Sequence, residues 1–281
     1  EIHERLVGSE MCIRDSSAVD ALKKDLAELR NRKIHLLKSA GFPEDYLEPV
    51  YDCPDCKDTG YIGNKKCHCF KKAIIGLLYD QSNIKKFPVE ADFSNFRLDY
   101  YPVSHYDKKT GRSSRSMMED TLRICHHFID SFGTEFNNLF FYGDVGVGKT
   151  FLSTCIAKEI MNREYSVLYF SAPQLFNTLA KNAFDKNDID AHNMCEYIFD
   201  CDLLIIDDLG TEYTNAFIAS QFFTCINERL LHRKSTIIST NLSLESLADL
   251  YTERSFSRIT SRYSLLKIVG DDIRIKKKLE H

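Results

Sequence analysis

The centre of the chain reads Leu139-Phe140-Phe141-Tyr142-Gly143-Asp144-Val145-Gly146-Val147-Gly148-Lys149-Thr150, an apolar run that leads directly into the pattern G-x-x-x-x-G-K-T. Glycines in this pattern let backbone N–H groups curl around a polyphosphate, while the lysine reaches the β- and γ-phosphate oxygens and the threonine hydroxyl completes a Mg²⁺ shell. The residue after the threonine begins a helix whose positive end points at the anion. The predicted phosphate-binding loop therefore consists of Gly143, Asp144, Val145, Gly146, Val147, Gly148, Lys149, Thr150 and Phe151.

The residues on both sides of this loop distinguish it from an ordinary glycine-rich turn. Residues 139–142 are consecutive apolar residues, which is typical of a buried parallel strand. Residues 151–160 repeat apolar side chains at helical period. A strand, a glycine loop and a helix in this order are the context that a phosphate-binding loop requires.

The composition limits the class of protein. With 281 residues, of which 43% are hydrophobic, the chain can bury a sizeable core in one medium domain plus a smaller one. The formal net charge of -4 gives no overall attraction for nucleic acid, so any such binding must rest on a local basic surface. No apolar run has membrane-spanning length, and no secretory signal is evident. We therefore expect a soluble, cytoplasmic protein without a membrane partner.

Two terminal segments are expected to contribute nothing to function. Residues 7–16 resemble a translated sequencing-adapter read, so residues 1–16 are expected to be a non-native or disordered leader. Residues 279–281, Leu-Glu-His, resemble the remnant of an affinity tag.

Four of the ten cysteines crowd into one short stretch, which favours a metal site in a reducing compartment. Cys53 and Cys56 form a C-x-x-C knuckle. Cys67 and Cys69 form a second pair, which follows a glycine-containing hairpin. Four soft ligands in tetrahedral geometry specify a structural Zn²⁺ ion with no open position for catalysis. A C-x-C spacing in the second pair is less common than a second C-x-x-C. His68 could therefore replace Cys67 or Cys69 as a metal ligand. A pair of disulfides or a set of free thiols competes with the metal site for the same four cysteines.

The segments around the cysteines have helical patterns. Residues 18–40 place apolar side chains near helical period among many charges and end at a Gly-Phe-Pro stop. The apolar face of this helix either packs on the metal module or docks on a partner, and the pattern alone does not separate the two. Residues 70–92 form a second, lysine-rich helical stretch. Residues 93–116 are polar and aromatic, which suits a linker or entry strap onto the next domain.

Strands alternate with helices in the second half of the chain. After a helix over residues 117–132, the candidate strands cover residues 139–142, 166–171, 203–207, 236–240 and 265–269. Such alternation predicts an α/β fold with a mostly parallel sheet covered by helices on both faces. Ligands in this architecture bind at the carboxyl ends of the strands, where the phosphate-binding loop lies.

Two carboxylates follow the apolar run of the third strand, in Leu-Leu-Ile-Ile-Asp207-Asp208. Asp207 is expected to hold Mg²⁺ through water opposite Thr150. Asp208 is the candidate for orienting or deprotonating an attacking water. Many related sites have Glu at this second position, and the shorter Asp leaves the efficiency of hydrolysis open.

Polar and basic residues near later strand ends complete the candidate site. Asn241 could contact a γ-phosphate or hold the water, with helix capping as the competing role, although Ser243 fills the capping role well. Arg254 and Arg258 share a helix face, so either could deliver a guanidinium to a γ-phosphate bound by a neighbouring subunit. A surface ion pair with neighbours such as Glu253 is the competing role for these arginines.

Taken together, these motifs resemble the AAA+ ATPases, and specifically the bacterial replicative-helicase loaders of the DnaC/DnaI type. The resemblance covers residues 51–274 and rests on CPDCKDTG, GDVGVGKT, LLIIDDLGTE, STIISTNLS, ERSFSR and GDDIR in this order. It implies an AAA+ P-loop NTPase domain, residues 117–278, joined by the strap, residues 93–116, to a small helical zinc-binding domain, residues 17–92, that binds a helicase.

The resemblance also implies roles for individual residues. Lys149 and Thr150 match the Walker A pair, Asp207 and Asp208 match the Walker B pair, and Asn241 matches sensor 1.

Three arginines are assigned in the same way. Arg258 matches an arginine finger that acts in trans, with Arg254 as the competing candidate, and Arg274 matches the sensor 2 arginine that acts in cis. The implied ligands are ATP or ADP, Mg²⁺ and Zn²⁺. The implied partners are a DnaB-type hexameric replicative helicase, single-stranded DNA and further copies of the chain. The expected function is ATP-dependent loading of that helicase onto single-stranded DNA, with ATP binding and hydrolysis switching assembly and release.

Two other functions compete with this interpretation. A transposition ATPase of the IstB type shares the AAA+ module, but that family would not need the zinc knuckle. A nucleotide-dependent binding switch with negligible turnover is kept open by the Asp at position 208.

Direct DNA contact is the least supported part of the interpretation. Aromatic residues in amphipathic helices are more often core than base-stacking residues. The candidates for a DNA channel are Lys181, Lys186, Arg229, Arg233 and Lys234, with Phe176 or Phe184 stacking on bases.

Overall fold

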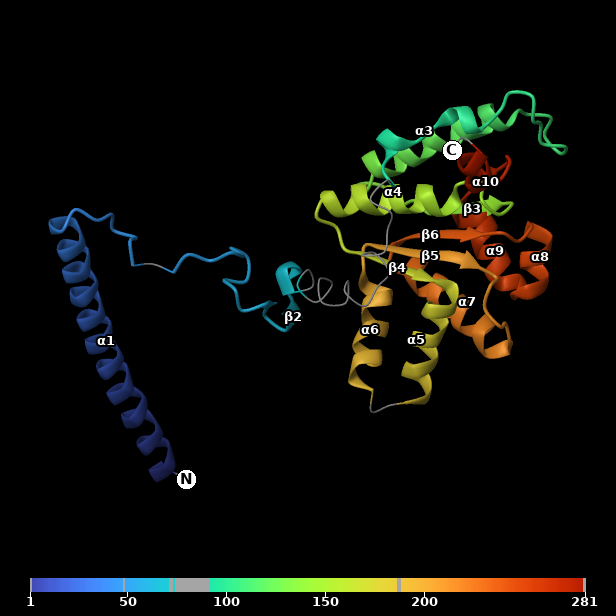
Figure 1. Ribbon diagram of the computed structural model, residues 1–281. Helices are drawn as coiled ribbons and strands as arrows, with labels where there is room; N and C mark the ends of the chain where they lie inside the picture. The colour runs from blue at the N-terminus through green and yellow to red at the C-terminus, as the bar shows by residue number, and fades with distance from the viewer. Residues whose placement is uncertain (1, 48, 71–72, 74–90, 186–187, 280–281) are drawn as a thin grey trace. The chain divides into compact units, whose positions relative to one another are not determined.

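The computed structural model describes the backbone of residues 2–47, 49–70, 73, 91–185 and 188–279, and side chains from residue 18 onward in these ranges apart from Lys66. The chain divides into two compact units, Glu1–Ile62 and Gly63–His281. Figure 1 shows the ribbon with its elements labelled. Most of the lysine-rich stretch predicted as helical, residues 71–72 and 74–90, lies outside the described residues.

The N-terminal unit contains one long helix, α1 (Ile2–Ser39), which begins before the helix expected from residue 18. The helix ends in a Schellman motif, in which the N–H of Phe42 donates to the Leu37 carbonyl (2.9 Å) and the N–H of Gly41 donates to the Lys38 carbonyl (3.1 Å). Gly41 has the positive φ, 80°, that this motif requires. Much of the apolar face of α1 lies at the surface, including Val19, Leu22, Leu26 and Leu29.

Five parallel strands form the sheet of the larger unit. Their order across the sheet is β4 (Val167–Ser171), β5 (Leu203–Leu209), β6 (Ser235–Thr240), β3 (Leu139–Gly143) and β7 (Ser264–Ile268). Register pairs Ser171 with Asp207 and Gly143 with Ile268, so the carboxyl ends of the strands share one edge. All five strands were predicted, and the α/β class is confirmed.

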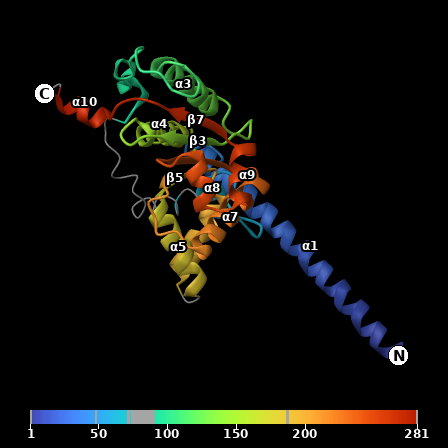
Figure 2. The same ribbon diagram turned by 90° about the vertical axis from the view of Figure 1, so that its right-hand side faces the viewer.

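Helices cover both faces of this sheet. In Figures 1 and 2, α3 and α4 lie on one face, and α5, α6 and α7 lie on the other. Phe141 and Ile205 point towards α4, whereas Phe140 and Ile206 point towards α7, because side chains alternate along a strand. Within the described residues from 91 onward, the α-helices are α3 (Ser114–Asp130), α4 (Lys149–Asn162), α5 (Ala172–Phe184), α6 (Ile189–Asp200), α7 (Ala216–Leu231), α8 (Leu244–Leu250), α9 (Glu253–Arg262) and α10 (Ile273–Leu279).

Two of the candidate DNA contacts were wrong, because they lie in the core. Arg229 is 1% exposed, and its guanidinium donates to the carbonyls of Ile198 (2.7 Å) and Ser235 (2.6 Å), among other acceptors. It therefore ties the end of α7 to α6 and β6. Phe176 is likewise buried, in the cluster between α5 and α7. These two residues cannot line a DNA channel in this fold.

The other candidates have different environments. Lys234 pairs with Asp202 (3.0 Å), and the Arg233 guanidinium lies 5.6 Å from the centre of the Phe136 ring. Lys181 is exposed, and Phe184 is 77% exposed at the end of α5. Lys186 lies outside the described residues. Within the described part of the chain, every helix is too short or too polar to span a lipid bilayer.

Candidate nucleotide-binding site

The predicted phosphate-binding loop connects the end of β3 to the start of α4. Gly148 occupies the N-cap position of α4 at a φ of 102°, which leaves the first N–H groups of the helix facing the loop. The Lys149 ammonium folds back on the loop and donates to the carbonyls of Gly143 (2.8 Å) and Asp144 (2.6 Å). Burial lowers the pKa of Lys149. The lysine is thus held at the mouth of the loop, where an anionic ligand would meet it.

A side chain at Gly143 would meet the backbone of a neighbouring strand. The φ of Gly143 is 143°, and a Cβ atom would lie 2.1 Å from the Ile268 carbonyl oxygen of β7. Gly143→Ala is expected to lower the free energy of unfolding by about 3 kcal/mol, because strain adds to a clash with backbone that cannot move cheaply. The measurement is urea denaturation followed by circular dichroism.

Gly111→Ala is the matched control for this prediction. Gly111 also has a positive φ, 67°, but nothing lies within 4 Å of its would-be Cβ. Only the conformational cost of about 1 kcal/mol is expected there. Equal losses of stability in the two variants would contradict the assigned role of the β7 contact.

A β-bulge explains how two consecutive carboxylates face the same cavity. The register between β5 and β6 shifts between Ile206 and Leu209, and Asp208 has a φ of 56°. In a regular strand Asp207 and Asp208 would point to opposite faces, but the bulge turns the second side chain towards the site. Both carboxylates line the cavity described below.

Asp207 is surrounded by hydroxyl groups. Its carboxylate accepts hydrogen bonds from Thr150 Oγ1 (3.0 Å), from Tyr169 Oη (2.8 Å) and from Ser239 Oγ. Thr150 and Asp207 therefore lie in contact, with oxygen atoms of the type that Mg²⁺ prefers. The pair fits the predicted metal position.

Asp208 lies between Asp207 and Asn241. Its N–H donates to Ser239 Oγ (3.0 Å), and its side chain and that of Asn241 line the same cavity. Burial raises the pKa of Asp208, and the neighbouring charge of Asp207 adds to this effect. Ser243 is the N-cap of α8, as its side chain accepts from the Ser246 N–H, so helix capping does not explain Asn241.

A cavity of about 500 Å³ joins these groups, and its wall includes residues that the sequence motifs did not reveal. The predicted strap contains two short 3₁₀ turns, η2 (Phe93–Asn95) and η3 (Leu98–Tyr100), and closes one side of the cavity. Tyr101 is buried, and its hydroxyl donates to the Val147 carbonyl (2.7 Å). The many aromatic residues of the strap were the feature of the sequence that could have predicted its place in the cavity wall. The lining residues outside the predicted site are Ala91, Asn95, Phe96, Arg97, Tyr100, Tyr101, Thr154, Ile273 and Lys277.

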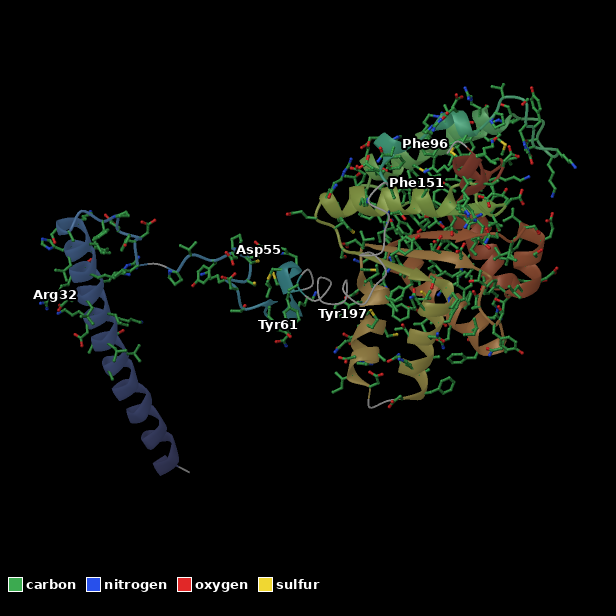
Figure 3. The ribbon with its side chains drawn as sticks, in the orientation of Figure 1. Arg32, Asp55, Tyr61, Phe96, Phe151 and Tyr197 are labelled. Carbon is green, nitrogen blue, oxygen red and sulfur yellow. The ribbon has the colours of Figure 1, made fainter. Side chains whose placement is uncertain are left out.

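Aromatic rings form part of this wall. Phe96 of the strap and Phe151 of α4 lie near each other in Figure 3, with their ring centres 6.1 Å apart. The Phe96 ring also stacks on Tyr101, at 5.8 Å. Flat apolar surfaces next to a phosphate-binding loop fit the base and sugar of a nucleotide.

The three candidate arginines lie in different places. Arg274 lines the cavity, next to Asp272, and the Ile273 N–H donates to the carbonyl of Gly146 (3.0 Å). Arg254 and Arg258 lie on the exposed face of α9 and do not line the cavity of their own chain. In the described part of the chain, neither of their guanidinium groups forms an ion pair or a hydrogen bond, so the competing role of a pair with Glu253 is not seen.

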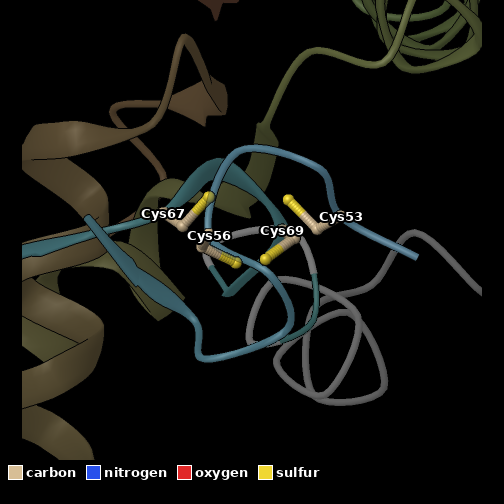
Figure 4. Close-up of side chains that lie close together, drawn as sticks. All are labelled: Cys53, Cys56, Cys67 and Cys69. Carbon is tan, nitrogen blue, oxygen red and sulfur yellow. The ribbon is translucent and has the colours of Figure 1, made fainter. Parts of the chain in front are cut away.

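The four clustered cysteines meet in one place (Figure 4). The Sγ atoms of Cys53, Cys56, Cys67 and Cys69 lie within 4.8 Å of one another. Zn–S bonds of about 2.3 Å in tetrahedral geometry would place the sulfurs about 3.8 Å apart, so the group fits a zinc ion after a small contraction. The His68 ring is outside this group, with Nδ1 3.5 Å from the Cys67 sulfur.

Local hydrogen bonds shape this cysteine knuckle. The Gly60 N–H donates to Cys56 Sγ (3.3 Å), and the Asp58 carboxylate accepts from the Cys53 N–H (2.8 Å). The short strands β1 (Tyr61–Ile62) and β2 (Lys65–Lys66) then return the chain to the second cysteine pair. N–H donation to sulfur favours the thiolate form that a metal requires.

The strand order, the loop and the paired carboxylates define the AAA+ class of P-loop ATPases. A family model described as IstB-like ATP binding protein matches residues 81–281, which is more than half of the chain. The chain belongs to this family of ATP-binding proteins.

Individual relatives agree with this class. The chain is 27% identical to the phage-like element PBSX protein XkdC of Bacillus subtilis, over 80% of this chain and 84% of that protein. It is 29% identical to the replicative helicase loader DnaI of the same organism, over 41% of this chain and 36% of DnaI. It is 23% identical to the replicative helicase loader DnaC of Escherichia coli K12, over 69% of this chain and 73% of DnaC.

Solved structures show the same fold. A crystal structure of the DnaC helicase loader matches with a TM-score of 0.50 and 26% identity, over 62% of this chain and 97% of that one. A crystal structure of DnaI matches with a TM-score of 0.52 and 24% identity, over 65% of this chain and 95% of that one. The resemblance to this group of proteins is confirmed.

Proposed function

We propose that this chain is an ATP-dependent loader of a hexameric, DnaB-type replicative helicase onto single-stranded DNA in the cytoplasm. The observation that carries the proposal is the cavity at the predicted phosphate-binding loop, together with the exposed Arg258 on α9 of the same unit. The chain is also similar to two replicative helicase loaders. The cysteine cluster upstream of the ATPase domain favours this function over that of a transposition ATPase, which would not need it.

The residues of the cavity would act in a defined order. Lys149 exchanges the carbonyls of its own loop for the β- and γ-phosphate oxygens of ATP. Thr150 and Asp207 hold Mg²⁺, which, when bound, neutralises phosphate charge. Asp208, which shares the cavity wall with Asn241, accepts the proton of the attacking water.

A second copy of the chain would supply one further positive charge to the γ-phosphate of the bound ATP. Arg274 already lines the cavity in cis, whereas Arg258 is exposed and does not line it. ATP bound between two subunits would bring Arg258 of one copy to the γ-phosphate of the next, which couples nucleotide state to assembly. Such an assembly would hold the helicase ring open while single-stranded DNA enters, and hydrolysis would release the loader.

The proposed helicase contact involves the exposed apolar row of α1. Leu22→Glu with Leu26→Glu is expected to abolish co-purification with the DnaB-type helicase of the same organism, because both leucines are about 60% exposed and no part of the described chain buries them. ATP affinity should stay unchanged. The measurement is pull-down from purified components, with nucleotide binding determined in parallel.

Val103→Glu is the matched control, because Val103 is an equally exposed apolar residue (56%) of the other unit. It should retain helicase binding. Capture of the helicase by the α1 variant at wild-type strength would contradict the proposed contact. DNA binding is tested separately. The affinity for labelled single-stranded DNA is measured with ATP and with ADP over a range of salt concentrations.

A binding switch with negligible turnover is the second candidate, and one observation favours it. Asp208 is one methylene shorter than the Glu of many related sites, so its carboxylate reaches less far towards an attacking water. Steady-state phosphate release with and without single-stranded DNA separates the two functions. Phosphate release at the background rate, both with and without single-stranded DNA, would support the binding switch as the function.

A further inference from the structure

Tyr169 makes a contact that the predicted nucleotide chemistry does not use. It lies on β4, is 4% exposed, and donates its hydroxyl hydrogen to Asp207 Oδ2 (2.8 Å). The register places Ser171 opposite Asp207 and Tyr169 opposite Ile205, so Tyr169 and Asp207 project on the same side of the sheet. The length of the tyrosine side chain lets its hydroxyl reach the carboxylate two positions further along.

Two further hydroxyl groups donate to Asp207. Thr150 Oγ1 (3.0 Å from Oδ2) is the hydroxyl that the phosphate-binding loop would give to Mg²⁺. Ser239 Oγ donates to Asp207 and also accepts the N–H of Asp208 (3.0 Å). If Thr150 gave its hydroxyl to a bound metal, Tyr169 and Ser239 would still donate hydrogen bonds to the carboxylate.

The ring of Tyr169 is held by the core. It packs in one cluster with Phe141, Ile205 and residues of α4. In the described part of the chain no lysine, arginine or histidine forms an ion pair with Asp207. Its orientation therefore depends on hydroxyl donors.

We propose that Tyr169 is a positioning residue that fixes Asp207 in the orientation required to hold Mg²⁺, and so sets how strongly nucleotide binding depends on the metal. This inference rests on the proposed ATP site. A carboxylate released from one of its two remaining donors would rotate between orientations, and only some of these face a metal at Thr150.

The test is a Mg²⁺ titration of fluorescent ATP binding to the full chain carrying Tyr169→Phe. The Mg²⁺ concentration for half-maximal tight binding should rise about tenfold, as expected for the loss of one hydrogen bond to a charged group. Affinity in EDTA should stay within about twofold of wild type, because the ring and the loop are unchanged. Tyr165→Phe is the control, since its hydroxyl donates to the Phe132 carbonyl (3.4 Å), before β3. That variant should titrate like wild type.

The outcomes separate the inference from the proposed function. Overlapping titrations for Tyr169→Phe and wild type overturn the inference alone, and so does an equal loss of affinity in EDTA, which indicates a purely structural role. A wild-type chain that binds no nucleotide overturns the ATP site and the inference together. A double-mutant cycle with Asp207→Asn supports the inference if Tyr169→Phe adds nothing to the effect of Asp207→Asn, and overturns it if the two effects add.

Discussion

Arg258→Ala is expected to leave ATP affinity unchanged and to lower steady-state ATP hydrolysis by about 10³-fold, the smaller end of what an arginine finger contributes. Affinity should persist because Arg258 does not line the cavity of its own chain, whereas Lys149 and Arg274 do. Hydrolysis should fall because the charge that stabilises the transition state is lost, and Arg254 is not expected to replace it. Filter binding of ATP and steady-state phosphate release measure the two effects.

Lys149→Ala is the contrasting variant. Lys149 is buried at the mouth of the loop, so its loss is expected to weaken nucleotide affinity itself by about 100-fold. Mixing the two inactive variants should restore part of the activity. In mixed assemblies a Lys149→Ala subunit supplies its intact Arg258 to the intact loop of an Arg258→Ala subunit.

Two results would reject the assignment in trans. The first is an equal loss of nucleotide affinity in Arg258→Ala and Lys149→Ala. The second is a mixture that shows no recovery. Arg254→Ala decides between the neighbouring arginines, since both lie on the exposed face of α9 and only one is expected to reach the next subunit. Wild-type hydrolysis by Arg254→Ala is the expected result.

Loss of zinc is expected to unfold the cysteine knuckle while leaving nucleotide binding intact. A structural zinc ion contributes about 10–16 kcal/mol of binding free energy, which is far more than a hairpin of two short strands can obtain from its own packing. Cys53→Ser with Cys56→Ser should release the metal and expose residues 53–69 to proteolysis. The measurements are metal content by atomic absorption and limited trypsin digestion.

Cys195→Ala is the control, because Cys195 is a buried thiol of α6 outside the cluster. It should retain one zinc ion per chain. ATP affinity should be unchanged in both variants, since the nucleotide cavity is lined by residues from Ala91 onward. A wild-type chain purified without zinc, and resistant to trypsin in the knuckle, would show that the metal is not required.

Several features followed from local patterns alone. The five strands, their parallel arrangement and the helix after Gly148 were predicted, because apolar runs and a glycine-rich loop constrain a few consecutive residues at a time. The grouping of Cys53, Cys56, Cys67 and Cys69 was also expected from spacing, since a hairpin brings near neighbours together. These predictions needed no knowledge of which elements pack on each other.

Other features depend on contacts between distant segments. Arg229 reads as a surface charge in sequence, but α7, α6 and β6 surround it with carbonyl groups. The strap contributes Phe96 and Tyr101 to the cavity because it packs against the loop and α4. Tyr169 looks like any core aromatic residue until the register with β5 puts its hydroxyl next to Asp207.

The sequence by itself predicted the class of fold, the phosphate-binding loop and the clustering of four cysteines. Each of these depends on residue type and spacing within one short segment, where backbone geometry follows directly from composition. The tertiary structure decided that Asp207 and Asp208 line one cavity, that Tyr169 donates a hydrogen bond to the first of them and that Arg258 does not line this cavity. Bulges, strand register and helix orientation result from the packing of the whole sheet, and no local pattern encodes them.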